Sequence, residues 1–165
     1  LENSARALGG AKVHFLHYQD GTLSNNLYHG VADKLAKLVK RYNPSLLITF
    51  DLNGGSGHLD HVAVSMITSY IYRKHQSIDA IWYNVVSREV SDAMADYFGF
   101  FPPGYRREGA DMVVDISSVF TQKVAAARCH VSQKHDADRI IARWMESPKE
   151  EWFLVDKRRD TLTIG

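Results

Sequence analysis

Apolar residues of the chain alternate between short continuous runs and segments with helical spacing. Residues 46–50 (LLITF) form a run without alternation, which is typical of a strand covered on both faces in a parallel sheet. Apolar residues at helical spacing occupy residues 31–42 before this run and residues 62–71 after it. Because helices alternate with strands, the pattern predicts an α/β fold whose functional residues lie at the carboxyl ends of the strands.

Further elements follow from the same periodicities. Strands are predicted at residues 11–18, 78–86, 112–116 and 152–155, and helices at residues 91–98, at residues 117–131 and from Asp136 to the residue before Pro148. Residues 1–8 have apolar positions at helical spacing and end at Gly9-Gly10, a helix stop signal. We therefore expect the last turns of a helix that begins before Leu1. The alternative is a short first helix of a complete chain that has lost its Met.

Length, composition and charge narrow the class of protein. The 165 residues, 45% of them hydrophobic and 24% charged, predict one globular domain over residues 1–165. A net charge of +1 provides no general attraction to nucleic acid or to an anionic membrane. No apolar run approaches the ~20 residues of a membrane span. The single cysteine, Cys129, cannot form an internal disulfide, so we expect a reducing, cytoplasmic compartment.

A glycine-rich loop with two histidines follows the strand at residues 46–50. It contains Gly54, Gly55 and Gly57 and ends in His58-Leu59-Asp60-His61 at the start of a helix. Neutral imidazole is a good zinc ligand, and a second imidazole beside the metal can stabilise a developing oxyanion. The alternative is a pair of surface histidines with Asp60 as the helix cap. The loop has neither a G-x-G-x-x-G pattern nor a P-loop lysine, which argues against a nucleotide-binding protein.

Other candidate residues lie elsewhere in the chain. Asp20-Gly21 follows the first predicted strand, where an aspartate can bind sugar hydroxyls, although Asp-Gly is first of all a turn sequence. His130, with Ser132 and Gln133 after it, ends a predicted helix, where it can instead cap the helix C-terminus. Cys129 is flanked by alanines within that helix and is interpreted as a small buried residue rather than a nucleophile.

The histidine motif is part of a wider resemblance. Residues 57–63 (GHLDHVA) resemble the G-H-P-D-H-x-A motif of the LmbE/PIG-L zinc deacetylases. Further segments agree with this family in order and spacing: residues 5–9, 13–16, Asp20-Gly21, 48–51, and Lys123, Ala127, His130, Ser132 and Gln133. The resemblance implies a Rossmann-like three-layer sandwich with a mostly parallel sheet. It also implies zinc-dependent hydrolysis of an N-acyl amide on a GlcNAc-like sugar or glycoconjugate.

The resemblance assigns a role to each candidate residue. His61 would be a zinc ligand, and His58 would stabilise the oxyanion. Asp60 would support the residues around the metal without binding the metal itself. Asp20 would line the sugar site. His130 would be structural or lie close to the substrate. The expected partner is a small-molecule sugar or glycoconjugate, and self-association into a homo-oligomer is possible.

Two departures from the family pattern matter. Leu59 replaces the usual proline of the motif, which changes loop stiffness and removes no ligand. The H-P-D-D-E type motif, which supplies the family's other two zinc ligands and its general base, does not occur. We expect these groups, and the N-terminal strand or strands, to belong to a segment outside this sequence, so that the domain is N-terminally incomplete. The alternative is a short, metal-free relative that binds a sugar without catalysis.

Overall fold

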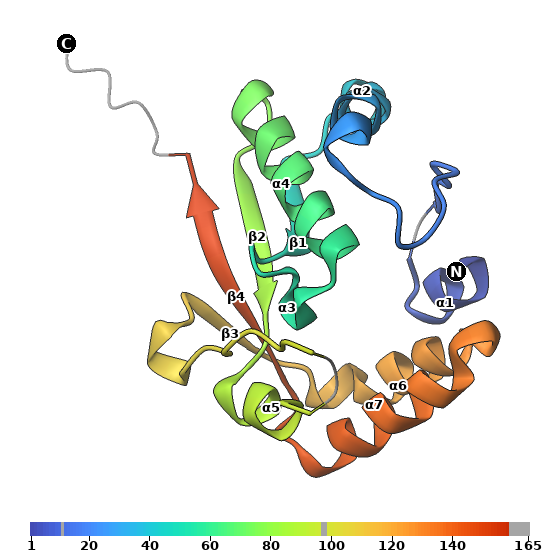
Figure 1. Cartoon of the computed structure of the whole chain (residues 1–165), viewed down its shortest axis with the longest axis vertical. Helices are drawn as coiled ribbons and strands as arrows, with labels where there is room; N and C mark the ends of the chain where they lie inside the picture. Colours follow the sequence, from blue (N-terminus) through green and yellow to red (C-terminus); the bar gives the residue numbers. More distant parts are fainter. Residues whose placement is uncertain (11, 97–98, 159–165) are drawn as a thin grey trace. The chain divides into compact units, whose positions relative to one another are not determined.

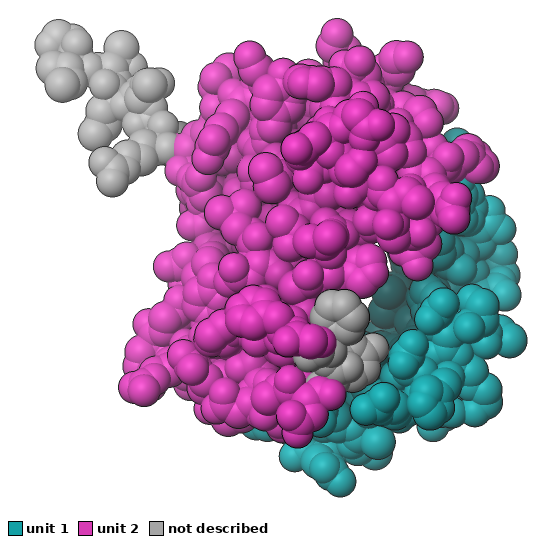
Figure 2. Space-filling view, viewed as in Figure 1, with its two compact units in different colours: residues 1–15, 114–151 teal, residues 16–113, 152–165 magenta. Residues whose placement is uncertain are grey.

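The computed structural model describes residues 1–10, 12–96 and 99–158, which form two compact units (Figure 1 and Figure 2). The first unit comprises residues 1–15 and 114–151, and the second comprises residues 16–113 and the segment after 151. The chain passes from one unit to the other after residues 15, 113 and 151. Whether residues 1–165 form one domain stays a prediction.

Four strands form an open sheet in the order β1-β2-β4-β3. They span Leu46–Phe50 (β1), Ala80–Val85 (β2), Met112–Asp115 (β3) and Glu150–Lys157 (β4). Strands β1 and β2 are parallel, as predicted, whereas β2 and β4 are antiparallel. The sheet is therefore mixed, and with its flanking helices it confirms the predicted α/β class. The prediction that both faces of β1 are covered is wrong, because β1 lies at the edge of the described sheet and Ile48 is 58% exposed.

Several helices belong to the second unit. They are α2 (Asn25–Tyr42), α3 (Gly54–Gly57), α4 (Leu59–Lys74) and α5 (Arg88–Ala93), with a 3₁₀ turn at Arg107–Gly109. Helix α4 packs on β1 and β2, and α2 packs against α4 (Figure 1). The first residues of α4 therefore lie directly beyond the carboxyl end of β1, where the histidine motif begins.

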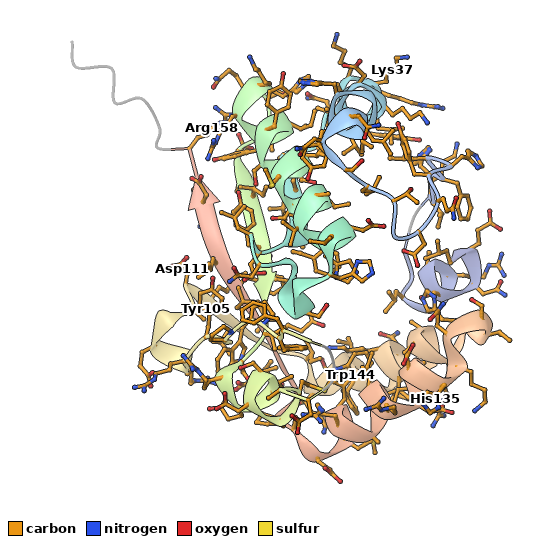
Figure 3. The ribbon with its side chains drawn as sticks, viewed as in Figure 1. Lys37, Tyr105, Asp111, His135, Trp144 and Arg158 are labelled. Atoms are coloured by element: carbon orange, nitrogen blue, oxygen red, sulfur yellow. The ribbon has the colours of Figure 1, made fainter. Side chains whose placement is uncertain are left out.

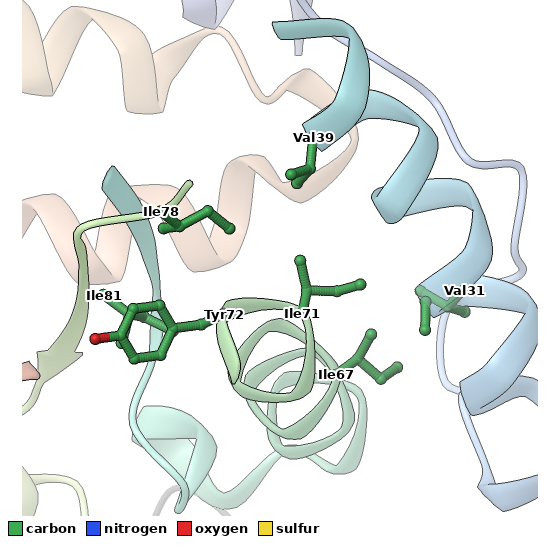
Figure 4. Close-up of a cluster of buried hydrophobic side chains, with 8 residues drawn as sticks. Val31, Val39, Ile67, Ile71, Tyr72, Ile78 and Ile81 are labelled. Carbon is green, nitrogen blue, oxygen red and sulfur yellow. The ribbon is translucent and has the colours of Figure 1, made fainter. Parts of the chain in front are cut away.

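Branched aliphatic side chains from these elements make the main core (Figure 4). Ile78 and Ile81 beside and within β2 have no exposed surface. The remaining members come from α2 and α4: Val31, Ala32, Val39, Ile67, Ile71 and Tyr72. Since a fully buried isoleucine contributes roughly 1.5–3 kcal/mol, this cluster holds α4 against the sheet and so fixes the direction of its N-terminus.

Arg158, after the end of β4, closes the opposite end of α4 (Figure 3). Its guanidinium donates from Nε to the carbonyl oxygen of Ile78 at 2.7 Å and from Nη2 to that of His75 at 3.1 Å. It also donates to the carbonyl of Tyr72 and lies over the Tyr72 ring, 4.7 Å from the centroid. A positive group at a helix C-terminus satisfies free carbonyls and complements the helix dipole.

The first unit is mainly helical. It contains α1 (Glu2–Ala7), α6 (Phe120–Arg128) and α7 (Lys134–Glu146), with 3₁₀ turns at Ser117–Val119 and Val131–Gln133. Helix α6 packs against both α1 and α7. Lys123 on α6 pairs with Glu151 at 2.9 Å and lies 4.3 Å from the ring centroid of Trp144 on α7. Through these two contacts, Lys123 connects α6 with α7 and with the start of β4.

The strand predicted at residues 11–18 is wrong for residues 12–18, which form no strand; residue 11 lies outside the described residues. His17 has a φ of 57°, which an extended strand does not allow. The carbonyl of Leu16 accepts from Lys34 Nζ at 2.7 Å, and Leu16 and Tyr18 pack against the main core. Burial of these side chains against α2 thus replaces the ladder that their β propensity suggested.

Other predicted elements differ mainly at their ends. Helix α2 begins six residues before the predicted start at Val31, and the predicted 91–98 helix is observed as α5, which ends at Ala93; residues 97–98 lie outside the described residues. The predicted helix 117–131 is divided into 3₁₀ turns and α6. In the described residues, no helix combines the length and the apolar character that crossing a bilayer requires.

The main core supplies a stability prediction. Ile81→Ala should lower the free energy of unfolding by about 2–5 kcal/mol, because it leaves a cavity between β2 and α4. Ile48→Ala on β1, where the side chain is 58% exposed, is the matched control and should cost less than about 1 kcal/mol. Urea unfolding monitored by circular dichroism measures both. Equal losses would mean that the core does not hold the sheet.

Candidate functional site

The turn between β1 and α4 is shaped by glycines in the left-handed region. Gly54, Gly55 and Gly57 have φ values of 67°, 66° and 77°. A Cβ on Gly54 would lie 2.8 Å from the backbone nitrogen of Val62 and 3.0 Å from Cβ of His61. Position 54 therefore needs glycine both for its φ and for its close approach to the first turn of α4.

His61 is held in one orientation by this turn. Its Nδ1 lies 3.1 Å from the carbonyl oxygen of Gly54, and its ring stacks on Phe50 with the centroids 4.1 Å apart and the planes 4° apart. A carbonyl oxygen only accepts, so the hydrogen bond assigns the proton of the neutral ring to Nδ1. The Nε2 lone pair then remains available, which is the arrangement of a metal-binding histidine.

His58 is held in the complementary arrangement. It is the N-cap of α4, and its Nδ1 accepts from the backbone N–H of Asp60 at 3.3 Å. The neutral ring therefore has its proton on Nε2, which is a donor. The rings of His58 and His61 are 4.9 Å apart, centroid to centroid. The two histidines thus present different atoms, a lone pair on one and an N–H on the other.

Asp60 does not cap α4, so the alternative interpretation of this residue as the helix cap is wrong. It is only 8% exposed, and its two carboxylate oxygens accept from the backbone N–H groups of Gly21 at 2.7 Å and Leu23 at 3.0 Å. The carboxylate satisfies donors of a distant turn, so the cap falls to His58 instead. As a result Asp60 anchors the Asp20-Gly21 turn beside the histidine motif, and Asp20 itself is exposed there.

Asp51 is a site residue that the sequence analysis missed. It follows β1, is only 4% exposed, and its Oδ1 accepts from the backbone N–H of Gly55 at 2.8 Å. Burial, together with the charge and the hydrogen bond of Asp51, raises the pKa of Tyr105 (Figure 3). The available signal was an acidic residue at the carboxyl end of an apolar strand.

His130 belongs to the first unit, whereas Asp20, His58, Asp60 and His61 belong to the second. It follows α6 and lines a cavity of about 630 Å³ within its unit. Side chains of α6 and α7 form much of that cavity, among them Lys123, Ala126, Ile140 and Trp144, and Gln133 of the 3₁₀ turn between these helices also lines it. A role of His130 near a substrate remains a prediction.

The donor set of the described residues fits part of a zinc site. His61 offers a free Nε2, but residues 1–10, 12–96 and 99–158 contain no group of three or more His, Cys, Asp or Glu side chains placed to hold a metal ion. A catalytic zinc usually takes three protein ligands. The described residues therefore provide one candidate ligand.

Sequence comparisons agree with the motif. A family model described as "PIG-L: GlcNAc-PI de-N-acetylase" matches residues 1–72, which include Asp20 and the histidine motif. The chain is 30% identical over 118 residues to the 1D-myo-inositol 2-acetamido-2-deoxy-alpha-D-glucopyranoside deacetylase of Mycobacterium sp. (strain KMS), covering 62% of this chain and 37% of that protein. It is 28% identical over 120 residues to the same-named protein of Corynebacterium diphtheriae, covering 67% and 41%. The chain thus spans about two fifths of these relatives.

Solved structures share the fold. GalB, the 4-carboxy-2-hydroxymuconate hydratase from Pseudomonas putida KT2440, is similar with a TM-score of 0.61 at 17% identity, over 98% of this chain and 71% of that one. A deacetylase of the teicoplanin biosynthetic pathway is similar with a TM-score of 0.58 at 19% identity, over 97% and 70%. These two likenesses show a shared α/β fold. Together with the sequence matches, the shared fold confirms the resemblance to the LmbE/PIG-L family.

The close packing at Gly54 leads to a prediction about stability. Gly54→Ala should destabilise the chain by about 1–3 kcal/mol, since it forces a non-glycine residue into the left-handed region and against the first turn of α4. Gly109→Ala, where a Cβ would meet no atom within 4 Å, is the control and should change little. Thermal unfolding compares the two. A Gly54→Ala protein as stable as the control would contradict the close packing of the turn.

The Asp51–Tyr105 contact predicts a pH effect. The pKa of Tyr105 is raised above its unfolded value of about 10, so its stabilising contribution is present below that pH and is lost as the pH rises through the folded pKa. Tyr105→Phe should flatten this alkaline loss, and Asp51→Asn should lower the pKa of Tyr105. The pKa of Tyr105 is measured from the tyrosinate absorbance during a pH titration, after the titration of Tyr105→Phe is subtracted from that of the wild type. A Tyr105 that ionises like an exposed tyrosine would contradict the contact.

Proposed function

We propose that the protein containing this chain removes the N-acetyl group of a GlcNAc-like sugar or glycoconjugate in a zinc-dependent hydrolysis. The observation that carries this proposal is the complementary hydrogen bonding of His58 and His61 at the end of β1. The matches to a de-N-acetylase family model and to sugar deacetylases support the reaction and the substrate class. A cytoplasmic location, expected from the lone cysteine, and a homo-oligomer are parts of the same proposal.

His61 is the zinc ligand of this proposal. The Gly54 carbonyl holds the proton on Nδ1 and orients the ring, so that Nε2 is directed by the turn rather than by the metal. Stacking on Phe50 restricts rotation of the ring. A zinc ion bound there supplies Lewis acidity toward water and an amide carbonyl. The remaining ligands and the general base come from residues other than those described.

His58 and the acidic residues act on the substrate. The Nε2–H of His58 donates to the oxygen that becomes negative when the amide carbonyl is attacked, because its Nδ1 is already occupied by the Asp60 N–H. Asp60 holds the Asp20-Gly21 turn in place, and Asp20 accepts hydrogen bonds from sugar hydroxyls. His130 is proposed to lie near the substrate.

A second candidate is a sugar-binding module without catalysis. It is favoured by one observation, that the described parts of the chain hold no complete three-ligand group. The hydratase with a similar fold shows that the fold alone does not select the reaction. The module would keep the Asp20 turn and the histidine pair but bind no zinc.

Two histidine substitutions separate the roles. In the protein that contains this chain, His61→Ala should remove bound zinc, because it deletes a ligand. His58→Ala should keep the zinc and lower kcat by about 10²–10³, the usual effect of losing one oxyanion donor. Metal analysis by mass spectrometry and deacetylation of an N-acetylglucosamine conjugate measure the two effects.

His135→Ala, at an exposed histidine of α7, is the matched control and should change neither zinc nor turnover. Unchanged zinc in His61→Ala would refute the ligand role. Loss of zinc in His58→Ala would mean that the two roles are exchanged. A wild-type protein that binds the sugar but no zinc would favour the binding module.

A further inference from the structure

Asp51 is a buried carboxylate that the proposed reaction does not use. It lies at the carboxyl end of β1 and is 4% exposed. Burying a charged group is costly unless hydrogen bonds satisfy it. Its backbone carbonyl accepts from Gly54 N at 2.9 Å, and its side chain accepts from Gly55 N at 2.8 Å. Both bonds hold the turn that precedes α4.

A single peptide group joins Asp51 to His61. The N–H of Gly55 and the C=O of Gly54 belong to the same peptide plane, and in a trans peptide they point in opposite directions. The N–H donates to Asp51 Oδ1 at 2.8 Å, and the C=O accepts from His61 Nδ1 at 3.1 Å. The carboxylate and the imidazole therefore lie at opposite edges of one plane and act on the same group.

This peptide needs an anchor. Both flanking residues are glycines in the left-handed region, where the backbone has more rotational freedom than at any other residue type. Rotation of the plane would carry the Gly54 carbonyl away from the His61 ring. A charged acceptor fixes the N–H more firmly than a neutral one does, and it polarises the peptide so that its carbonyl accepts more strongly.

We propose that Asp51 is a positioning residue for His61, and that it acts through the Gly54–Gly55 peptide to keep the His61 proton on Nδ1. The arrangement is a carboxylate–peptide–histidine relay, in which the carboxylate orients the imidazole without touching it. Its consequence for zinc binding rests on the proposed function. The orientation of His61 does not, because it is a property of the chain without metal.

The segment that carries Tyr105 is held firmly near the end of β2. The backbone N–H of Tyr105 donates to the Val86 carbonyl at 2.8 Å, and Gly104 N donates to Ser91 Oγ at 2.8 Å. A Cβ on Gly104 would lie 2.3 Å from the carbonyl oxygen of Ser87, so only glycine permits this approach. The segment is thereby fastened next to the end of β2, where burial and the charge of Asp51 both contribute to the raised pKa of Tyr105.

The tautomer of His61 distinguishes positioning from general loop stabilisation. In the chain labelled with ¹⁵N-histidine, imidazole nitrogen shifts measured at about pH 8, where histidine is neutral, report which nitrogen is protonated. The wild type should show His61 protonated on Nδ1. Asp51→Ala should lower the Nδ1–H to Nε2–H ratio roughly two- to tenfold, the worth of one hydrogen bond. Asp51→Asn keeps an acceptor and should restore most of the ratio.

Asp111→Ala is the matched control. Asp111 also accepts from a backbone N–H at 2.8 Å, but from Val155 on β4 rather than from the glycine turn, so the His61 tautomer should not change. A folded Asp51→Ala chain with the wild-type tautomer overturns the relay. If Asp51→Ala does not fold, the test is the amide proton resonance of Gly55 in Asp51→Asn. This resonance should move upfield, because the acceptor is then neutral. An unmoved resonance overturns the relay. A relay that holds while zinc fails to bind refutes only the proposed function.

Discussion

The hydrogen bond between the Gly54 carbonyl and Nδ1 of His61 determines what the histidine motif presents. Two histidines three residues apart have no fixed chemistry, because either ring nitrogen of each can hold the proton. Here the glycine turn offers His61 an acceptor and the first turn of α4 offers His58 a donor. The same backbone segment therefore gives the two rings opposite protonation, and a lone pair and an N–H result from otherwise identical side chains.

That hydrogen bond depends in turn on the packing of the second unit. The apolar cluster between α2, α4 and β2 holds α4 against the sheet, and Arg158 closes its C-terminal end. The N-terminus of α4 then follows β1 after only the glycine turn. Gly54 accommodates this short connection because it has no Cβ to meet Val62 or His61. Core packing and site geometry are thus linked through one helix, and a loss of packing would change the site without altering a site residue.

Long-range contacts account for most of what the sequence patterns did not predict. The strand proposed at residues 11–18 had the right composition, but Leu16 and Tyr18 lie against the core and the backbone pairs with Lys34 instead of with a strand. Asp60 had the right position for a helix cap, but its carboxylate binds Gly21 and Leu23, almost forty residues away in the sequence. In both cases a contact with a residue far away in the sequence overrode the local propensity.

The sequence alone determined the α/β class, the strand at residues 46–50 and the histidine motif after it, because periodicity, glycine content and motif spacing are local properties. It also indicated the LmbE/PIG-L resemblance, which the comparisons confirm. Only the tertiary structure decided which ring nitrogen each histidine offers, that Asp60 anchors the Asp20 turn, and that Asp51 holds the glycine turn before α4. Those features depend on hydrogen bonds between residues that the fold brings together, and a proton moves to whichever nitrogen finds an acceptor.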